Sequence, residues 1–246
     1  MLNYIWTDIK MILRVPLSVF FSMVYPIMMM FIIILSYGNM SIGGDYHLID
    51  KYFLITIGMG ILPFTLVSFP IWIASQIEDN SLKRLQYFRV SFFQVIFSDI
   101  ISHFIVALLS MILNILVAFF IFNLKVPSFK YFAAFLGQYI LAIIVFMLMG
   151  GFIALILKKQ QIVMPFGLVI MFALYMFCGA FITFDQLPKA IQDIASYIPM
   201  KYAMIDFFNI WSMTQYGDKT FLILSLLYIC VLSLGIFLAY KKSYER

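Results

Sequence analysis

Six long apolar runs, separated by shorter polar segments, dominate the hydrophobic pattern of this 246-residue chain. Each run reaches the roughly 20 residues that an α-helix needs to cross about 30 Å of hydrocarbon. The pattern therefore predicts an all-α integral membrane protein with six transmembrane helices. The third run is too long for one straight crossing, so we expect its first turns to lie along the membrane surface. The predicted spans are Leu17–Tyr37, Tyr52–Ser75, Phe92–Phe122, Tyr131–Leu157, Ile162–Phe184 and Phe221–Tyr240.

Two shorter segments are amphipathic. Residues 1–16 carry an apolar stripe at helical spacing together with Trp6 and basic residues, which is typical of a helix lying in the membrane interface. A plain polar lead-in is the alternative. In residues 185–211, Pro188 and Pro199 separate pieces too short to span, so we expect re-entrant or interfacial helices rather than a plain loop. Residues 17–246 then form a single six-helix membrane domain.

The composition agrees with this class of protein and orients it. The chain is 65% hydrophobic and has a mean hydropathy of +1.05, against roughly 45–50% apolar residues in soluble domains. Loops on the side of the two termini hold 10 Lys and Arg, and the opposite loops hold 6. The positive-inside rule therefore predicts that both termini are cytosolic. The basic residues form no cluster larger than two, so nucleic acid is not an expected partner.

The segment 76–91 is a charged island between the second and third spans. Charges cost several kcal/mol at the centre of a bilayer, so the segment must lie outside the hydrocarbon, in the cytosol by the orientation above. Residues 80–89 can form a short helix that transmits force from a soluble partner; a surface loop that only sets topology is the alternative. The candidate contact residues are Glu78, Asp79, Ser81, Leu82, Lys83, Arg84, Leu85 and Arg89.

Four polar residues share one face of the third span. Asp99, His103, Ser110 and Asn114 are spaced by four, seven and four residues, which aligns them along a helix. Polar groups inside a membrane usually face the bundle interior or an aqueous path. The stripe therefore either lines a translocation path or forms a polar seam between helices, and we favour the seam for Asp99 and His103.

Enzymatic signatures are missing from the sequence. It contains no HExxH, no GxSxG and no GxxxxGK[ST] phosphate loop, and two histidines cannot form a metal cluster. We expect no catalytic residue, no metal site and no bound cofactor in this chain. ATP hydrolysis, if it drives this protein, must take place in a separate subunit.

The order of these features resembles the type-2 permease family of ATP-binding-cassette (ABC) exporters. The family's loop after the second span often follows E-x(n)-G-T-x-E-x-L and ends near a proline. Glu78, Ser81 and Leu85 fit this pattern, whereas Asn80, Lys83 and Val90 replace its Gly, Glu and Pro. Before the last span, the chain has a span ending at Phe184 and then Leu187, Pro188, Pro199 and Tyr202, similar to the family's Leu-Pro, Pro and aromatic sequence.

The resemblance implies partners and a mechanism. Two permease subunits, identical or homologous, would associate with two ATP-binding subunits that carry ATP and Mg²⁺. Segment 76–91 would be the coupling site, and the segment with Leu187, Pro188, Pro199 and Tyr202 would gate the extracellular side.

The sequence thus predicts the permease subunit of a bacterial ABC exporter in the cell membrane. Its expected substrate is hydrophobic or amphipathic: a peptide first, otherwise a drug or a lipid-linked molecule. The alternatives are a secondary transporter or channel driven by an ion gradient through Asp99 and His103, and a membrane scaffold or sensor that transports nothing.

Overall fold

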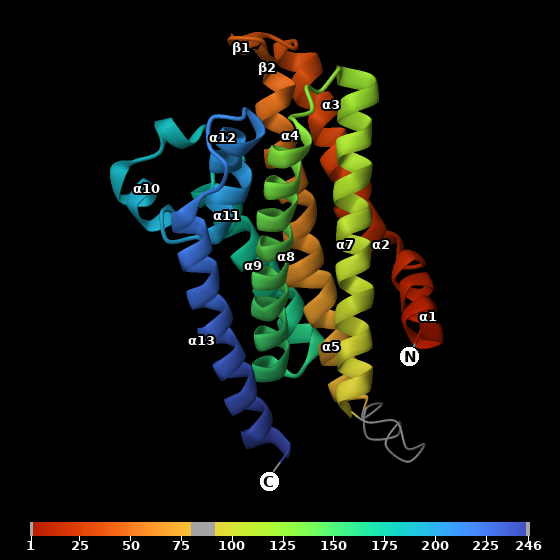
Figure 1. The fold of residues 1–246 in the computed structure, drawn as a ribbon. Coiled ribbons are helices and arrows are strands. Elements are labelled where there is room, and N and C mark those ends of the chain that lie inside the picture. The colour runs from red at the N-terminus through yellow and green to blue at the C-terminus, as the bar shows by residue number, and fades with distance from the viewer. Residues whose placement is uncertain (1, 80–91, 245–246) are drawn as a thin grey trace.

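The computed structural model describes residues 2–79 and 92–244, and the described part is a helical bundle with one small hairpin (Figure 1). The first half contains α1 (Leu2–Leu13), α2 (Pro16–Val19), η1 (Phe20–Val24), α3 (Tyr25–Tyr37), β1 (Ser41–Gly43), β2 (Tyr46–His47), α4 (Leu48–Pro63), η2 (Phe64–Ser68), α5 (Phe69–Glu78) and α7 (Phe92–Phe122). The second half contains α8 (Phe129–Leu157), α9 (Gln160–Phe177), η3 (Phe184–Gln186), α10 (Lys189–Ala195), α11 (Pro199–Lys201), η4 (Tyr202–Asp206), α12 (Phe207–Trp211) and α13 (Lys219–Tyr244).

The predicted all-α membrane fold with six spans is confirmed. In the described part of the chain, six helical stretches are long and apolar enough to cross a membrane: Phe20–Tyr37, Leu48–Glu78, Val95–Phe122, Phe129–Leu157, Gln160–Phe177 and Lys219–Ala239. The fifth ends seven residues before the predicted Phe184. Gly179 adopts a φ of +76°, a left-handed conformation typical of a residue that ends a helix, and hydropathy alone does not reveal it.

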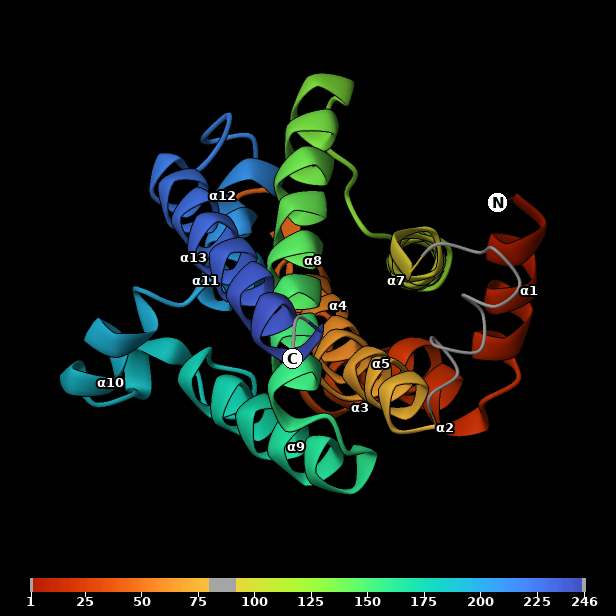
Figure 2. The same cartoon turned by 90° about the horizontal axis from the view of Figure 1, so that it is seen from below.

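The third span differs from the expectation in its first turns. α7 is one continuous helix of 31 residues, and it runs straight along the bundle (Figure 1). The prediction that its beginning turns aside along the surface was wrong, because no proline or glycine interrupts this helix. The helix that is oriented across the direction of the spans is α1, which lies at the edge of the bundle and is seen from the side in Figure 2, while α7 is seen almost end-on.

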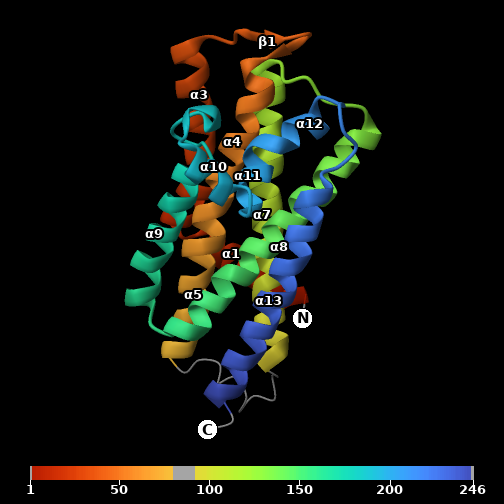
Figure 3. The ribbon, with the colours of Figure 1, turned by 90° about the vertical axis from the view of Figure 1, so that its left-hand side faces the viewer.

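The second span is the centre of the bundle. Residues 48–78 form one rod from three consecutive helical segments, α4, π-helical η2 and α5, and 83% of its most apolar window is buried. α5 lies between α8 and α9, and α4 packs against α3 and α7 (Figure 3). A helix surrounded in this way must satisfy its backbone polar groups through its neighbours wherever its own hydrogen bonding is interrupted.

Prolines interrupt that hydrogen bonding at defined carbonyls. Pro63 has no N–H to donate to the carbonyl of Met59, and the Tyr175 hydroxyl of α9 donates to this oxygen at 2.6 Å instead. Pro26 likewise has no N–H for the carbonyl of Ser22, and the Ser110 hydroxyl of α7 donates to that oxygen. Side chains of neighbouring helices thus replace the bonds that the prolines remove.

Pro70 leaves two further carbonyls of the rod without its N–H, and a glycine of a neighbouring helix packs against each of them. Pro70 cannot donate to the carbonyl of Leu66, four residues back, or to that of Thr65, five back. A Cβ atom added at Gly150 of α8 would lie 2.1 Å from the Thr65 oxygen. One added at Gly167 of α9 would lie 2.2 Å from the Leu66 oxygen. These two glycines allow α8 and α9 to touch the backbone of the π-helical segment.

Buried aromatic and polar groups hold the elements together at the end of the bundle that carries the β-hairpin. Trp211 of α12 is fully buried, packs on Phe53 and Phe135, and donates from Nε1 to the Lys125 carbonyl at 2.8 Å. The buried Asp50 carboxylate accepts from the backbone N–H of Lys125 at 2.8 Å and from that of His47 at 2.7 Å. The α7–α8 connection is therefore fixed to both α4 and α12.

We predict that Gly150→Ala lowers the unfolding temperature of the detergent-purified protein, whereas Gly151→Ala leaves it nearly unchanged. The methyl group at position 150 meets a backbone oxygen that cannot move without moving the rod, and such overpacking costs about 1–3 kcal/mol. A Cβ at Gly151 finds its nearest atom, Cε1 of Phe69, at 3.7 Å, an ordinary contact. Equal unfolding temperatures for the two variants would contradict the proposed contact between α8 and η2.

Candidate functional site

A buried carboxylate joins two helices at the bundle end that holds both termini. Asp99 of α7 has no solvent exposure. Its Oδ1 accepts a hydrogen bond from Trp72 Nε1 at 3.2 Å, and its Oδ2 accepts one from Gln76 Nε2 at 2.8 Å. Both donors belong to the last turns of α5, directly before residues 80–91. Asp99 therefore holds the end of the central rod against α7.

A second carboxyl group approaches Asp99 from the N-terminal helix. Asp8 of α1 is 1% exposed, and neither of its carboxyl oxygens has a hydrogen-bond partner among the described residues. Burial raises the pKa of Asp8 to about 7, and the nearby Asp99 carboxyl contributes to the increase. Burial and the same two carboxyls raise the pKa of Tyr4 to about 12. The Ser102 hydroxyl of α7 donates to the Ser98 carbonyl of its own helix at 2.7 Å and lies 3.3 Å from the Ile5 carbonyl, so α1 contacts the same site.

His103 lies one turn beyond Asp99 in an aromatic enclosure. Its Nδ1 is 2.8 Å from the Asp99 backbone oxygen; because a carbonyl only accepts, this nitrogen carries the proton. The rings of Phe64, Phe69 and Trp72 surround the imidazole, with centroids 5.0–5.9 Å away. The hydrogen bond of His103 is thus with its own helix, and its ring contacts are with the central rod.

The other two polar residues of the stripe lie further along α7, and both are buried. Ser110 donates to the Ser22 carbonyl that Pro26 leaves without a donor. Asn114 donates from Nδ2 to the Ser110 carbonyl at 2.8 Å, and its Oδ1 has no hydrogen-bond partner among the described residues. The four residues thus share one buried face of α7, but their partners belong to different elements.

Two of the eight candidate contact residues of segment 76–91 lie in the described structure. Glu78 is the last residue of α5, and its Oε2 accepts from the backbone N–H of Gln160, the first residue of α9, at 3.1 Å. A carboxylate at a helix N-terminus is favourable because it faces unpaired N–H groups and the positive end of the helix dipole. Asp79 follows as the C-cap of α5. Ser81, Leu82, Lys83, Arg84, Leu85 and Arg89, with the predicted helix 80–89, lie outside the described residues.

The predicted gate segment forms short helices at the opposite end of the bundle. Leu187 and Pro188 precede α10, and Pro199 is the buried first residue of α11. The Tyr202 hydroxyl donates to the Ser196 carbonyl at 2.8 Å. The segment packs on the central rod at Gly58, where an added Cβ would lie 2.5 Å from Cε of Met200 and 2.6 Å from Cγ of Met204. The described structure thus places this segment in contact with the same rod whose other end approaches Asp99.

Sequence reasoning missed Asp8 and the donors Trp72 and Gln76. Asp8 lies three residues after Ile5 and four before Ile12, so it falls on the apolar stripe of α1. A charged residue on an apolar face at this spacing signals a buried partner. Within the described residues, no group of three His, Cys, Asp or Glu side chains could hold a metal ion.

Comparison with known families identifies the chain. Residues 2–210 match the family model described as ABC-2 type transporter. The chain belongs to this family. No curated protein and no solved structure matches it.

Membership of the ABC-2 family makes this chain the multi-pass permease subunit of an ABC transporter, which works with a separate ABC ATPase subunit. The match covers segment 76–91, the polar stripe of α7 and the predicted gate segment up to residue 210, and it ends before α13.

We predict that the stability of the detergent-purified chain falls between pH 5 and pH 8, and that Asp8→Asn reduces this fall. The folded protein binds the Asp8 proton more tightly than the unfolded chain does, because its pKa rises from 3.8 to about 7. The resulting stability is fully present below pH 3.8 and is lost as the pH rises through 7, when a buried carboxyl must ionise. The measurement is the unfolding temperature across this range. The control is Asp193→Asn, at an exposed position of α10; the same pH slope in both variants would contradict the role of Asp8.

Proposed function

We propose that the protein is the membrane subunit of an ABC exporter and that α5 passes the movement of the ATPase into the membrane. The observation that carries this proposal is the attachment of α5 at its end. Asp99 of α7 accepts hydrogen bonds from Trp72 and Gln76 in the last turns of α5. Glu78, the last residue of α5, accepts one from the first residue of α9. Any displacement of segment 76–91 therefore acts on α7 and α9 as well as on α5.

The central rod extends this movement to the other end of the bundle. Residues 48–78 are continuous helix, so a push at Glu78 reaches Gly58, about 30 Å away at 1.5 Å per residue. There the rod touches Met200 and Met204 of the gate segment. Closure of the two ATP-binding subunits at one end would shift the gate segment at the other. This one-piece connection supports the role of residues 185–211 as the extracellular gate.

The remaining assignments belong to the same proposal. Both termini and segment 76–91 are cytosolic, α1 lies in the interface of a bacterial cell membrane, and a second permease subunit completes the path. ATP and Mg²⁺ bind to the partner ATPase. The substrate is hydrophobic or amphipathic, a peptide first and otherwise a drug or a lipid-linked molecule, in keeping with spans rich in Phe and Met.

We predict that the chain, expressed with the products of its neighbouring genes, co-purifies with a P-loop ATPase in equal amounts. The combined variant Lys83→Glu and Arg84→Glu should lose most of the ATPase, because reversed charges repel a surface that fits basic residues. The control is Lys51→Glu with Lys189→Glu, two exposed positions near the other end of the bundle.

Two results would contradict this proposal. ATPase binding that survives the charge reversal would remove segment 76–91 from the interface. Full transport by the purified chain alone, driven by a proton gradient, would favour the secondary transporter that uses Asp99 and His103.

We predict that Trp72→Phe uncouples the transporter: the assembled complex should keep its ATPase activity, whereas transport should fall several-fold. Phe retains the aromatic contact with His103 but removes the Nε1 donor to Asp99, and a buried polar group left without its partner costs about 1–3 kcal/mol. The control is Trp6→Phe, at a residue that is 59% exposed. Parallel loss of ATPase activity and transport would instead indicate a purely structural role for the bond.

A further inference from the structure

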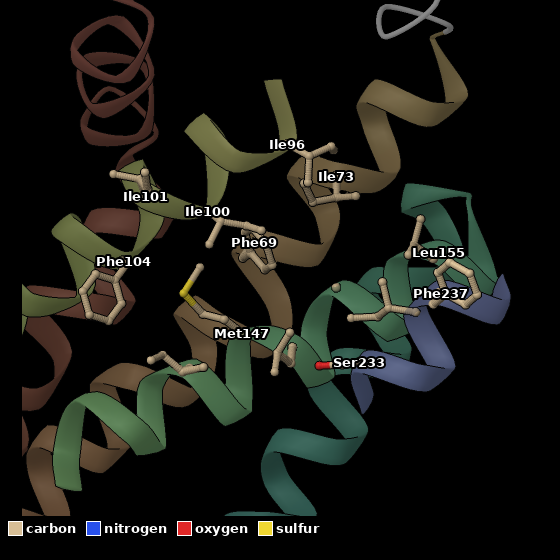
Figure 4. A pocket seen from close by; sticks show the side chains of 14 residues that line it. Phe69, Ile73, Ile96, Ile100, Ile101, Phe104, Met147, Leu155, Ser233 and Phe237 are labelled. Atoms are coloured by element: carbon tan, nitrogen blue, oxygen red, sulfur yellow. The ribbon is translucent and has the colours of Figure 1, made fainter. Parts of the chain in front are cut away.

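A cavity of about 520 Å³ lies between four spans in the half of the bundle that holds both termini. Figure 4 shows its walls: Phe69 of α5, Ile100 of α7, Met147 of α8 and Phe237 of α13. Its size falls in the range of about 300–1,000 Å³ that is common for sites of small ligands. Phe69 also contacts the ring of His103 beside the Asp99 site, and none of the four belongs to the gate segment.

The chemistry of the lining selects an apolar occupant. Among the described lining residues, the Ser233 hydroxyl is the one polar side-chain group (Figure 4). A buried water needs two to four polar partners, which these walls do not offer. A hydrocarbon chain, which needs no hydrogen bond, fits this lining.

The position of the cavity indicates that such a hydrocarbon chain would come from the membrane. All four walls belong to helices that span the membrane by length and composition. α13 packs mainly on α8, and Phe237 of the cavity wall is itself 61% exposed, so the wall that α13 forms borders the surrounding hydrocarbon. The lining residues of α13 occupy the last turns of its span, and those of α7 the first turns. The cavity therefore lies at the depth of the leaflet nearest the termini.

Positive charges lie where a lipid headgroup would be. Lys241 follows Phe237 by four residues on α13, and Lys158 follows Leu155 by three at the end of α8; both lysines are exposed. One helical turn is about 5.4 Å, so each lysine lies one turn beyond the cavity wall on the same helix face. The phosphate of a lipid whose chain enters the cavity would lie at the level of these two lysines.

We propose that this cavity binds an acyl chain of an anionic phospholipid from the leaflet nearest the termini, with the lipid phosphate held near Lys241 and Lys158. Lipid tails are as apolar as the cavity walls, so hydrophobic burial supplies little net free energy inside a bilayer. Packing and charge must select the lipid. Because Phe69 and Ile73 belong to α5, the bound chain contacts the central rod and fills the space between α7 and α13.

The first test fills the cavity with protein. The full chain is extracted from vesicles of phosphatidylglycerol and phosphatidylcholine, washed in detergent, and weighed by native mass spectrometry to count retained lipids. Ser233→Trp should lower retained phosphatidylglycerol several-fold, and Leu234→Trp, next to it but outside the cavity lining, should not. A second matched pair, Leu155→Trp with Ile156→Trp, repeats the test from α8 in case one variant fails to fold.

The second test concerns the charge. Phosphatidylglycerol should be retained in preference to phosphatidylcholine, and Lys241→Gln should reduce this preference about fivefold, the value of one lysine near an anionic surface. Lys219→Gln, at the other end of α13, is the control. Equal retention in both members of each Trp pair would overturn the proposal, as would equal retention of the two lipids by the unaltered chain. A change in oligomeric state with Ser233→Trp, without loss of lipid, would assign the cavity to a second copy of the chain instead.

Discussion

The structure depends on how backbone carbonyls are satisfied where prolines interrupt helices inside a membrane. Little water is available there, so each carbonyl without an N–H needs a donor from another helix. Tyr175 supplies a hydroxyl to Met59, and Ser110 supplies one to Ser22. These bonds tie α9 to α4 and α7 to η1. The prolines therefore specify which helices must be neighbours, in a protein whose helix surfaces are too uniformly apolar to specify them by hydrophobicity.

The same constraint makes the second span a single mechanical unit. A helix with prolines at 63 and 70 could bend freely if its weakened turns faced lipid. Here η2 is enclosed by Gly150 of α8 and Gly167 of α9, whose missing side chains bring backbone against backbone. Close packing of this kind resists deformation, so under the proposed function a displacement at Glu78 would move neighbouring helices instead of bending the rod. The coupling proposed for α5 follows from this enclosure.

The sequence was sufficient to predict the six spans and the short helices before α13, because length, hydropathy and proline positions determine them. It could not predict the end of the fifth span, where the left-handed Gly179 outweighs five further residues of largely apolar sequence. The hydrogen bonds of Asp99 with Trp72 and Gln76 could not be predicted either, because helical spacing shows which residues share a face but not which helix packs against that face. Asp8 was the exception: a carboxyl on an apolar stripe was visible, and only the tertiary structure shows that it meets Asp99.

The hydrogen bonds of α7 bear on whether its polar stripe conducts a substrate or a proton. Both carboxylate oxygens of Asp99 are occupied by donors of α5, and the Ser110 hydroxyl serves a backbone carbonyl. Between them, aromatic rings of α5 and η2 enclose His103. A conducting path needs groups that can exchange partners along its length, whereas these groups hold helices together. The geometry within one subunit therefore favours a seam, and under the proposed function the substrate path would lie on a surface shared with a second permease subunit.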